Sequence, residues 1–291
     1  MVALGMGKHE LTHEVIFIGL PGPTHHYGGL SADNVASSSN RGTISSPKQA
    51  ALQVLALVRR LRGLGVNTAI LPPQLRPHMA LLPMGIAAAP LALLEQASSS
   101  SAMWVANAAT VTPSCDSADG LLHLTTANLL TNPHRRIEAE DTYRTLSAIF
   151  SHVPNAVVHP PVANPDEGAA NHMRLGGLHV FVYGEAGRQS LAASQEIAKS
   201  HGLSPQQTLF IEQNPEVIRA GVFHNDVIAV SHETLLLVHE KAYVGGIKAI
   251  EEAAPNAKII TVAERELSVE EAVKTYFFNS QIVNTKKTAW R

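Results

Sequence analysis

Hydrophobic and polar positions along this chain change repeatedly between two spacings. Short apolar runs, bounded by glycine, proline and polar residues, have the length and composition of buried strands. They lie at residues 15–20, 68–71, 121–125, 156–159, 178–183, 208–211, 227–230, 235–238 and 258–262. The sequence therefore predicts a protein with short strands spread over its whole length.

Other segments have the three- and four-residue apolar spacing of helices. The clearest helix follows Ser46, a good N-cap, and starts at Pro47, which suits the first helical position. Its apolar residues are Ala51, Val54, Leu55, Val58 and Leu61, and Gly63 or Gly65 ends it. Further helices are predicted at residues 138–150 and 190–201, a weakly helical stretch at 78–100, and a last helix opened by a capping box of Ser268 and Glu271.

The order of these elements indicates the fold class. Strands occur singly or in pairs, and a helix then follows. Straight alternation of strands and helices would predict a doubly wound parallel sheet. The paired strands at 227–230 and 235–238 favour repeated ββαβ units of an α/β fold instead. No low-complexity linker is long enough to divide the chain, so we expect one domain over residues 1–291.

Composition narrows the functional classes. Hydrophobic residues make up 45% of the 291 residues, as in soluble globular proteins, and charged residues only 16%. A net charge of −2 with scattered Lys and Arg does not indicate a nucleic-acid partner. The single cysteine, Cys115, excludes an intrachain disulfide and fits a reducing cytoplasm. Charge interrupts the apolar amino-terminal stretch at residues 8–10, and later apolar runs are strand-sized, so we expect no signal peptide and no membrane segment.

Two acidic segments are candidates for chemistry. In the first, Asp166 and Glu167 precede a glycine and two alanines, and this turn has little side-chain bulk to keep a carboxylate from a ligand. A carboxylate matches the planar fork of a guanidinium group, but the same turn could simply open a helix. In the second, His224 stands two residues before Asp226 at a strand edge. This pair suits general acid–base chemistry, and the alternative is a surface histidine in a turn.

Two polar segments offer further binding groups. Asn107 lies among small residues, and a buried asparagine needs hydrogen-bond partners that a ligand can supply. The alternative is close packing of a helix or strand through its alanines. His134, Arg135 and Arg136 follow a proline turn, and arginine binds carboxylates well. A solvated basic turn is the alternative there.

Other chemistries receive less support from the sequence. The glycine-rich loop at residues 21–31 has neither of the glycine motifs that bind phosphate or dinucleotide. Fifteen histidines make a metal site conceivable, but none has a tight metal-binding spacing; the candidate ligands are His25, His26, His172, His224, His232, His239, Asp166, Glu167 and Asp226. Cys115 is a candidate nucleophile, although its acidic neighbour disfavours a thiolate and favours a structural role.

Nine segments, taken in order, resemble the N-succinylarginine dihydrolase family. They are GPTHHYGGLS (22–31), NVAS (34–37), LPPQLRP (71–77), SAMWVANAATVTPS (101–114), DEGAANHMRLGG (166–177), FVYG (181–184), QQTLFIEQNPEVI (206–218), GVFHNDVIAV (221–230) and YFFNSQ (276–281). The resemblance implies an α/β pentein fold, a five-fold β/α-propeller of ββαβ units, which we expect to be incomplete at the carboxyl-terminal end.

The resemblance also implies an activity. The family hydrolyses N2-succinylarginine to N2-succinylornithine, carbon dioxide and two ammonia in arginine catabolism by the succinyltransferase pathway. It implies a cytoplasmic homodimer that acts on this small molecule and needs neither a metal nor an organic cofactor. No nucleic-acid or membrane partner is expected.

The implied mechanism is covalent, with a cysteine thiolate that attacks the guanidinium carbon. The resemblance assigns Glu167 to hold the guanidinium and His224 to move protons to the departing ammonia and from the attacking water. It assigns substrate contacts to Gly28, Gly29, Leu30, Ser31, Ala32, Asp33, Asn34, Val35, Ala36, Ser37, Asn107, His134, Arg135, Arg188 and Asp226.

The chain departs from the family pattern after residue 283. The glycine-rich Asn-Gly-Gly-Gly-Pro-Ala-Cys segment that carries the family's nucleophile is not in the sequence, and Cys115 lies in a different motif. We therefore expect the 291-residue chain to be hydrolytically inactive. The alternatives are a non-catalytic homologue that binds substrate or a partner subunit, and a metal-dependent amidohydrolase that uses Glu167, His224 and Asp226.

Overall fold

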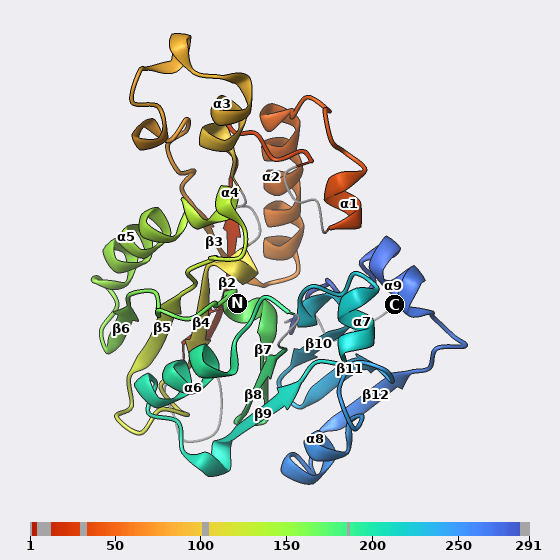
Figure 1. Cartoon of the computed structure of the whole chain (residues 1–291). Coiled ribbons are helices and arrows are strands. Elements are labelled where there is room, and N and C mark those ends of the chain that lie inside the picture. The colour runs from red at the N-terminus through yellow and green to blue at the C-terminus, as the bar shows by residue number, and fades with distance from the viewer. Residues whose placement is uncertain (1, 5–12, 30–33, 101–104, 185–186, 286–291) are drawn as a thin grey trace.

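A computed structural model describes residues 2–4, 13–29, 34–100, 105–184 and 187–285. Within these residues the strands form four three-stranded sheets that lie around a common centre (Figure 1). The first sheet contains β1 (Val2–Leu4), β2 (His13–Gly19) and β3 (Asn67–Leu71), and the second β4 (Ala109–Thr112), β5 (Leu122–Thr126) and β6 (Ala156–His159). The third contains β7 (His172–Leu175), β8 (Leu178–Tyr183) and β9 (Thr208–Glu212), and the fourth β10 (Ala229–His232), β11 (Leu235–His239) and β12 (Lys258–Val262).

All four sheets have the same connectivity. The first two strands of each pair antiparallel, and the second and third pair parallel. A parallel pair needs a crossover, and a helix provides it in every sheet. These helices are α2 (Pro47–Gly63), α5 (Ala139–Phe150), α6 (Leu191–Ser200) and α8 (Lys248–Ala253). The predicted ββαβ repeat is confirmed.

Shorter helical elements lie in the connections. They are α1 (Val35–Ser38), α3 (Leu91–Ser98), α4 (Pro133–Arg136), α7 (Pro215–Arg219) and α9 (Val269–Thr275). Single 3₁₀ turns are η1 (Met79–Leu81), η2 (Ile86–Ala88), η3 (Val105–Asn107), η4 (Gly168–Asn171), η5 (Pro205–Gln207) and η6 (Asn225–Val227). The predicted weakly helical stretch at 78–100 is therefore two 3₁₀ turns and one short helix.

Hydrophobic packing is unequal among the sheets. One large cluster joins the third and fourth sheets and includes the fully buried Val180 and Val182 of β8 and Leu236 and Val238 of β11. The first sheet has a much smaller cluster, in which Ile16 and Ile18 pack against α2 and against Val283. The third and fourth sheets thus share one core. The first sheet packs on its own helix and, through Phe17 and Leu71, joins a separate cluster with the second sheet.

One predicted strand starts later than expected. Residues 225–227 form η6, and β10 begins at Ala229 rather than at Val227. The side chain of Asn171 accepts a hydrogen bond from Asn225 N (2.8 Å), and Tyr243 donates to Asn225 Oδ1 (2.8 Å). These tertiary contacts hold the backbone in a turn, which the apolar pattern of the segment cannot indicate.

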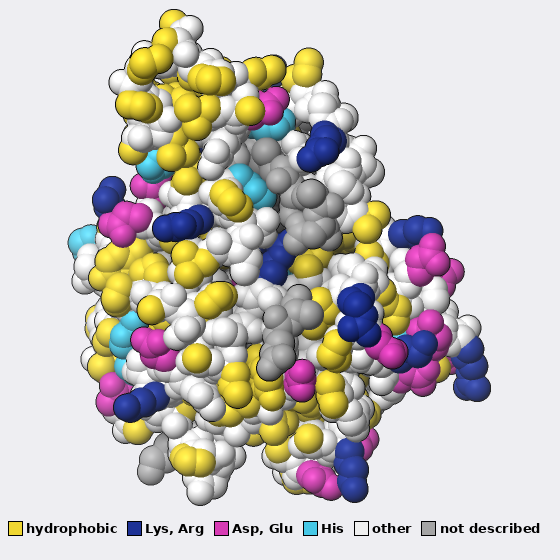
Figure 2. Space-filling model, viewed as in Figure 1, with side chains coloured by type: hydrophobic (Ala, Val, Ile, Leu, Met, Phe, Trp, Pro, Cys, Tyr) yellow, Lys and Arg dark blue, Asp and Glu magenta, His cyan; other side chains and the backbone are white. Residues whose placement is uncertain are grey.

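Hydrophobic side chains are also exposed on one side of the molecule. They cover the lobe that carries α3, at the top of the view in Figure 2. Leu75, Met84 and Leu91 are 90%, 78% and 71% exposed, respectively. No helix among the described residues is long and apolar enough to cross a membrane.

Candidate active site

A cavity of about 930 Å³ lies among the loops and helix ends that connect the sheets. Its lining comes from the loop after β2, the start of α2, η3, α4, the residues before α6, η6, and the turn after α9. From the predicted site it includes Gly28, Gly29, Asn34, Ser37, Asn107, His134, Arg135, Arg188, His224 and Asp226. The structure thus brings together ten residues that are far apart in the sequence.

Glu167 and His224 form a buried pair at the edge of this cavity. His224 Nε2 lies 3.0 Å from Glu167 Oε2, and the Glu167 side chain is fully buried. Arg135 donates to the same oxygen (2.7 Å), and Thr131 donates to Oε1 (2.6 Å). An ionised carboxylate accepts only, so His224 carries a proton on Nε2. Glu167 therefore fixes the tautomer and the orientation of the imidazole ring.

Opposing effects set the pKa of Glu167. Burial would raise it, but the hydrogen bond from His224, the charge of Arg135 and the Thr131 hydroxyl together lower the pKa to about 2. Glu167 is consequently a carboxylate at neutral pH, even though water does not reach it.

The backbone around Glu167 is held by buried amide side chains. Gln189 accepts from Glu167 N (2.9 Å) and donates to Asp166 Oδ1 (3.0 Å). Asn128 accepts from Asp166 N (3.0 Å), and Asn107 donates to the carbonyl oxygen of Glu167 (3.2 Å). These contacts fix the turn at η4, so the position of the Glu167 carboxylate is defined by the surrounding fold.

No sequence motif marks Asn128, Thr131 or Gln189 as functional residues. They lie in segments without a chemical motif, and each contacts the Asp166–Glu167 turn over more than 20 residues of sequence. A buried polar residue without a local partner would have been the only available signal. The sequence pattern does not show whether an isolated amide or hydroxyl side chain is buried, so it could not identify these residues.

Asp226 lies on the other side of His224. Its Oδ1 is 3.9 Å from His224 Nδ1, and its Oδ2 accepts from Asn279 Nδ2 (2.9 Å). Burial raises the pKa of Asp226, and the interactions with His224 and Arg135 only partly oppose this effect. The side chain remains 25% exposed, so this carboxylate can be reached from the cavity.

Arg188 lies over an aromatic ring next to His224. Its guanidinium carbon is 4.5 Å from the centroid of the Phe223 ring, a distance typical of cation–π contacts. Phe223 in turn packs edge-on against His224, with 4.7 Å between ring centroids. Arg188 thus adds a nearly buried positive charge to the wall of the cavity.

The glycine-rich loop after β2 forms another part of the wall. Gly29 has a φ of +69°, and a Cβ atom there would lie 2.4 Å from the Cα of Arg41, so only glycine fits. Asn34 caps α1 by accepting from Ser37 N (3.0 Å) and also accepts from the Tyr276 hydroxyl (2.8 Å).

Several predicted contact residues are not placed in the cavity wall. Val35 belongs to α1, is exposed and is not among the described residues that line the cavity. Leu30, Ser31, Ala32 and Asp33 lie outside the described residues.

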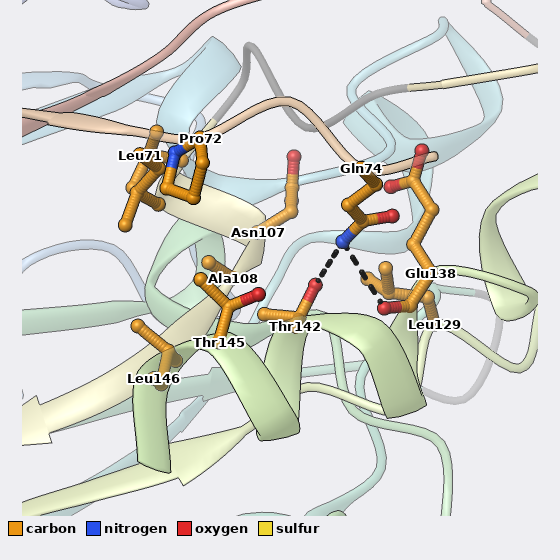
Figure 3. A pocket seen from close by; sticks show the side chains of 11 residues that line it. Leu71, Pro72, Gln74, Asn107, Ala108, Leu129, Glu138, Thr142, Thr145 and Leu146 are labelled. Carbon is orange, nitrogen blue, oxygen red and sulfur yellow. Dashed lines mark hydrogen bonds between the residues drawn. The ribbon is translucent and has the colours of Figure 1, made fainter. Parts of the chain in front are cut away.

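A second, much smaller pocket lies behind Asn107 (Figure 3). Its volume is about 30 Å³, which is room for a single water molecule. Gln74 crosses it by donating to Thr142 Oγ1 (2.9 Å) and to the carbonyl oxygen of Glu138 (3.4 Å). This pocket is too small for a substrate. The larger cavity is the candidate active site because ten of the predicted site residues line it.

Cys115 lies at a different cavity, together with Asp116 and the glycine pair Gly176–Gly177. Burial and the neighbouring Asp116 raise the pKa of the thiol. No cysteine is among the described residues that line the candidate active site. Within the described part of the chain, no three His, Cys, Asp or Glu side chains come together in a metal-binding arrangement.

The chain is similar to proteins of one enzyme family. A family model described as succinylarginine dihydrolase matches residues 11–290. The N-succinylarginine dihydrolase of Acinetobacter baylyi is 44% identical over 312 residues, which cover 93% of this chain and 70% of that protein. The N-succinylarginine dihydrolase of Sphingopyxis alaskensis is 46% identical, with 93% of this chain and 69% of that protein covered.

Solved structures show the same fold at low sequence identity. The N-terminal domain of ArgZ, an arginine dihydrolase from cyanobacteria, superimposes with a TM-score of 0.62 at 18% identity and covers 94% of this chain and 80% of that chain. DDAH from Pseudomonas aeruginosa, in complex with citrulline, superimposes with a TM-score of 0.53 at 15% identity and covers 89% and 80%. The architecture expected from the sequence, a pentein β/α-propeller, is confirmed.

Proposed function

We propose, since this chain belongs to the succinylarginine dihydrolase family, that its cavity binds N2-succinylarginine for hydrolysis of the guanidinium group. The overall reaction consumes two water molecules and yields N2-succinylornithine, carbon dioxide and two ammonia. The observation that carries the proposal is the row formed by Glu167, His224 and Asp226, which ends at the wall of a substrate-sized cavity.

The geometry favours a division of roles that differs from the one the resemblance implies for Glu167. Its carboxylate already accepts from Thr131, Arg135 and His224, is fully buried and does not line the cavity. We therefore assign the guanidinium contact to Asp226 and a positioning role to Glu167. An accessible carboxylate oxygen can accept a charge-assisted hydrogen bond from a guanidinium group, which makes Asp226 the better partner.

His224 is the group that moves protons. Glu167 fixes its Nε2, and its other ring nitrogen, Nδ1, faces Asp226 and hence the proposed position of the guanidinium group. A histidine in this position can protonate departing ammonia and then deprotonate the attacking water, because its imidazole Nδ1 can both release and accept a proton.

The carboxylates of the substrate need positive partners. Arg188, His134 and Arg135 line the same cavity, and arginine binds carboxylates through paired hydrogen bonds. Asn107 and the loop around Gly28 and Gly29 add polar groups and backbone amides to this wall. We propose that these residues, with Asn34 and Ser37, bind the succinyl and α-carboxylate ends of the substrate.

Hydrolysis by a covalent route also needs a thiolate at the cavity. Cys115 is the only cysteine of the sequence, and it lies at another cavity with a raised pKa. This position favours the second candidate function for the 291 residues, which is binding of the substrate without turnover.

Calorimetric titration of the purified chain with N2-succinylarginine tests the proposal. We expect saturable binding, and we expect arginine to bind more weakly because it lacks the succinyl carboxylate that would meet the arginine side chains. Asp226→Asn should weaken the binding of N2-succinylarginine about tenfold or more, since a charge-assisted pair to the guanidinium is lost. Equal affinity for both ligands, or none for N2-succinylarginine, would contradict the proposal.

We further propose that the protein is a single catalytic domain that works as a cytoplasmic homodimer. The exposed apolar lobe around α3 supports a subunit contact, because monomers rarely expose several large apolar side chains in one place. Light scattering on the purified chain gives the oligomeric state directly.

A further inference from the structure

The turn that follows α9 contacts the cavity at two points. Tyr276 donates from its hydroxyl to Asn34 Oδ1 (2.8 Å), and Asn279 donates from its amide to Asp226 Oδ2 (2.9 Å). Both Tyr276 and Asn279 line the cavity, and so do both of their partners. One short turn therefore holds residues from the first and the fourth parts of the fold at the same site.

This turn is rigidly supported. Tyr276 ends α9 in a left-handed conformation (φ 53°, ψ 36°), a backbone state that a non-glycine residue adopts only when its surroundings enforce it. Between the two contact residues, Phe278 is fully buried and packs edge-on against His239, with 6.4 Å between ring centroids. At the other end, a capping box of Ser268 and Glu271 fixes the start of α9. The Asn279 amide is consequently presented from a fixed backbone.

The two oxygens of Asp226 have different surroundings. Oδ1 is buried, lies 3.9 Å from His224 Nδ1, and accepts no hydrogen bond from the described residues. The side chain as a whole is 25% exposed, so the oxygen that a ligand can reach is Oδ2, which Asn279 holds. A carboxylate oxygen can accept a second hydrogen bond, so the contact with Asn279 leaves Oδ2 able to bind a ligand N–H.

We propose that Asn279 is a positioning residue for the guanidinium-binding carboxylate: it fixes the rotation of the Asp226 side chain so that Oδ2 faces the ligand and Oδ1 faces His224. This inference rests on the proposed function. Without the Asn279 donor the carboxylate is free to rotate, and a bound guanidinium group would have to order it.

The Asn279 amide also acts on the charge of Asp226. Its hydrogen bond lowers the pKa of Asp226 and so opposes burial, which raises it. The other charged or titratable groups that act on this carboxylate are His224 and Arg135, which lower its pKa, and Glu167, which raises it. Two further ionisable residues near Asp226, Tyr276 and Arg188, lie in the cavity wall. Loss of the Asn279 donor would raise the pKa of Asp226 further.

The test compares Asn279→Ala with Lys274→Ala in the 291-residue chain. Lys274 is a matched control because it lies on α9, just before the turn, is exposed, and forms its ion pair among the described residues with the exposed Glu270. We expect Asn279→Ala to weaken the binding of N2-succinylarginine about tenfold, the usual cost of a hydrogen bond to a charged group. As the pH falls, this variant should lose binding at a higher pH than the unaltered chain does, because binding needs ionised Asp226. Lys274→Ala should change neither quantity, and both variants should keep the thermal midpoint of the unaltered chain.

A ligand-free measurement separates this inference from the proposed function. Carboxyl NMR resonances give the pKa of Asp226 in the unaltered chain and in both variants, and we expect an increase only in Asn279→Ala. An unchanged pKa, or unchanged binding by Asn279→Ala while the unaltered chain binds, would overturn the inference and leave the proposed function intact. If the unaltered chain does not bind N2-succinylarginine, the proposed function fails and the inference fails with it, while the pKa still shows whether Asn279 acts on Asp226.

Discussion

At the residue scale, the surroundings shift the pKa values of two adjacent carboxyl groups, Asp166 and Glu167, in opposite directions. Glu167 is ionised and accepts from three donors, one of them the nearly buried Arg135. In Asp166, Oδ1 accepts from Gly168 N and Gln189, while the buried Oδ2 accepts no hydrogen bond from the described residues. Burial raises the pKa of Asp166 to about 7, whereas the donors around Glu167 lower its pKa to about 2.

These two pKa shifts predict that the contributions of Glu167 and Asp166 to the free energy of unfolding change with pH in opposite directions. Because its pKa is lowered, Glu167 stabilises the fold at pH values above 4.5, the ordinary pKa of a glutamate. This contribution is lost as the pH falls towards 2. A raised pKa means that Asp166 favours the folded state while it is protonated. That contribution is lost as the pH rises from its ordinary value of 3.8 through about 7.

We therefore expect Glu167→Gln and Asp166→Asn to have different effects on the free energy of unfolding at pH 8. Glu167→Gln leaves Arg135 without its ionised partner and should lower the free energy of unfolding by about 3 kcal/mol. Asp166→Asn removes a buried charge, keeps the acceptor at Oδ1, and should not lower it. Urea denaturation provides the measurement, and Arg144→Ala is the control, because its ion pair with Glu140 is exposed and should contribute less than about 1 kcal/mol. Similar losses in the two carboxyl variants would contradict this account.

At the element scale, the second and third sheets meet α6 through buried histidines. His201, at the end of α6, lies between the hydroxyls of Thr112 (2.8 Å) and Thr125 (2.7 Å). It stacks against His123 and His159, whose rings lie 5.3 and 5.4 Å from its own. Burial lowers the pKa of His159 and His201, and of His172 and His179 in the third sheet. These histidines hold the elements together in their neutral form.

This packing predicts a loss of stability in mild acid. Each histidine binds a proton more readily in the unfolded chain than in the folded one, so the free energy of unfolding should fall as the pH drops below about 6.5. In His201→Gln the decrease between pH 8 and pH 5.5 should be smaller, because one of the groups is removed. Guanidinium denaturation at several pH values measures the slope, and His152→Gln, an exposed histidine, should leave it unchanged. An equal slope in all three proteins would refute the prediction.

The elements differ in how far the sequence could predict them. Hydrophobic periodicity located α2, α5, α6 and most strands, because these segments are long or bury one continuous face. It missed β1, β4 and β7. In β7, His172 and Arg174 alternate with Met173 and Leu175, and their partners are His179 on the neighbouring strand β8 and Asp116 in an earlier loop. Residues at the cavity were named through motif resemblance, whereas Asn128 and Gln189, which support the Asp166–Glu167 turn, became visible only in three dimensions.

At the scale of the whole molecule, the ββαβ repeat brings the connections of four sheets to one cavity, and these connections supply its groups. Proton transfer, guanidinium binding and carboxylate binding each have a candidate among the described residues, but a nucleophile does not. We therefore expect a polypeptide of these 291 residues to release no ammonia from N2-succinylarginine, since loss of a nucleophile removes several orders of magnitude of rate.

An ammonia-release assay on this chain and on Cys115→Ala checks this prediction. Neither should be active, and appending the family's glycine-rich cysteine segment should restore turnover. Turnover that disappears in Cys115→Ala would identify Cys115 as the nucleophile and contradict the structural role proposed for it. Turnover that remains in both proteins would favour metal-dependent hydrolysis.

The unequal packing of the sheets determines which part of the binding site unfolds first. His224 and Asp226 belong to the part that shares the large common core, whereas Gly28, Gly29 and Asn34 are connected to the first sheet, which packs in two smaller clusters. Regions with few buried apolar contacts open at a lower free-energy cost than the core does. Under gentle warming, one wall of the binding site should therefore come apart while the opposite wall stays folded. Affinity for the substrate would then disappear at temperatures where most of the protein is still native.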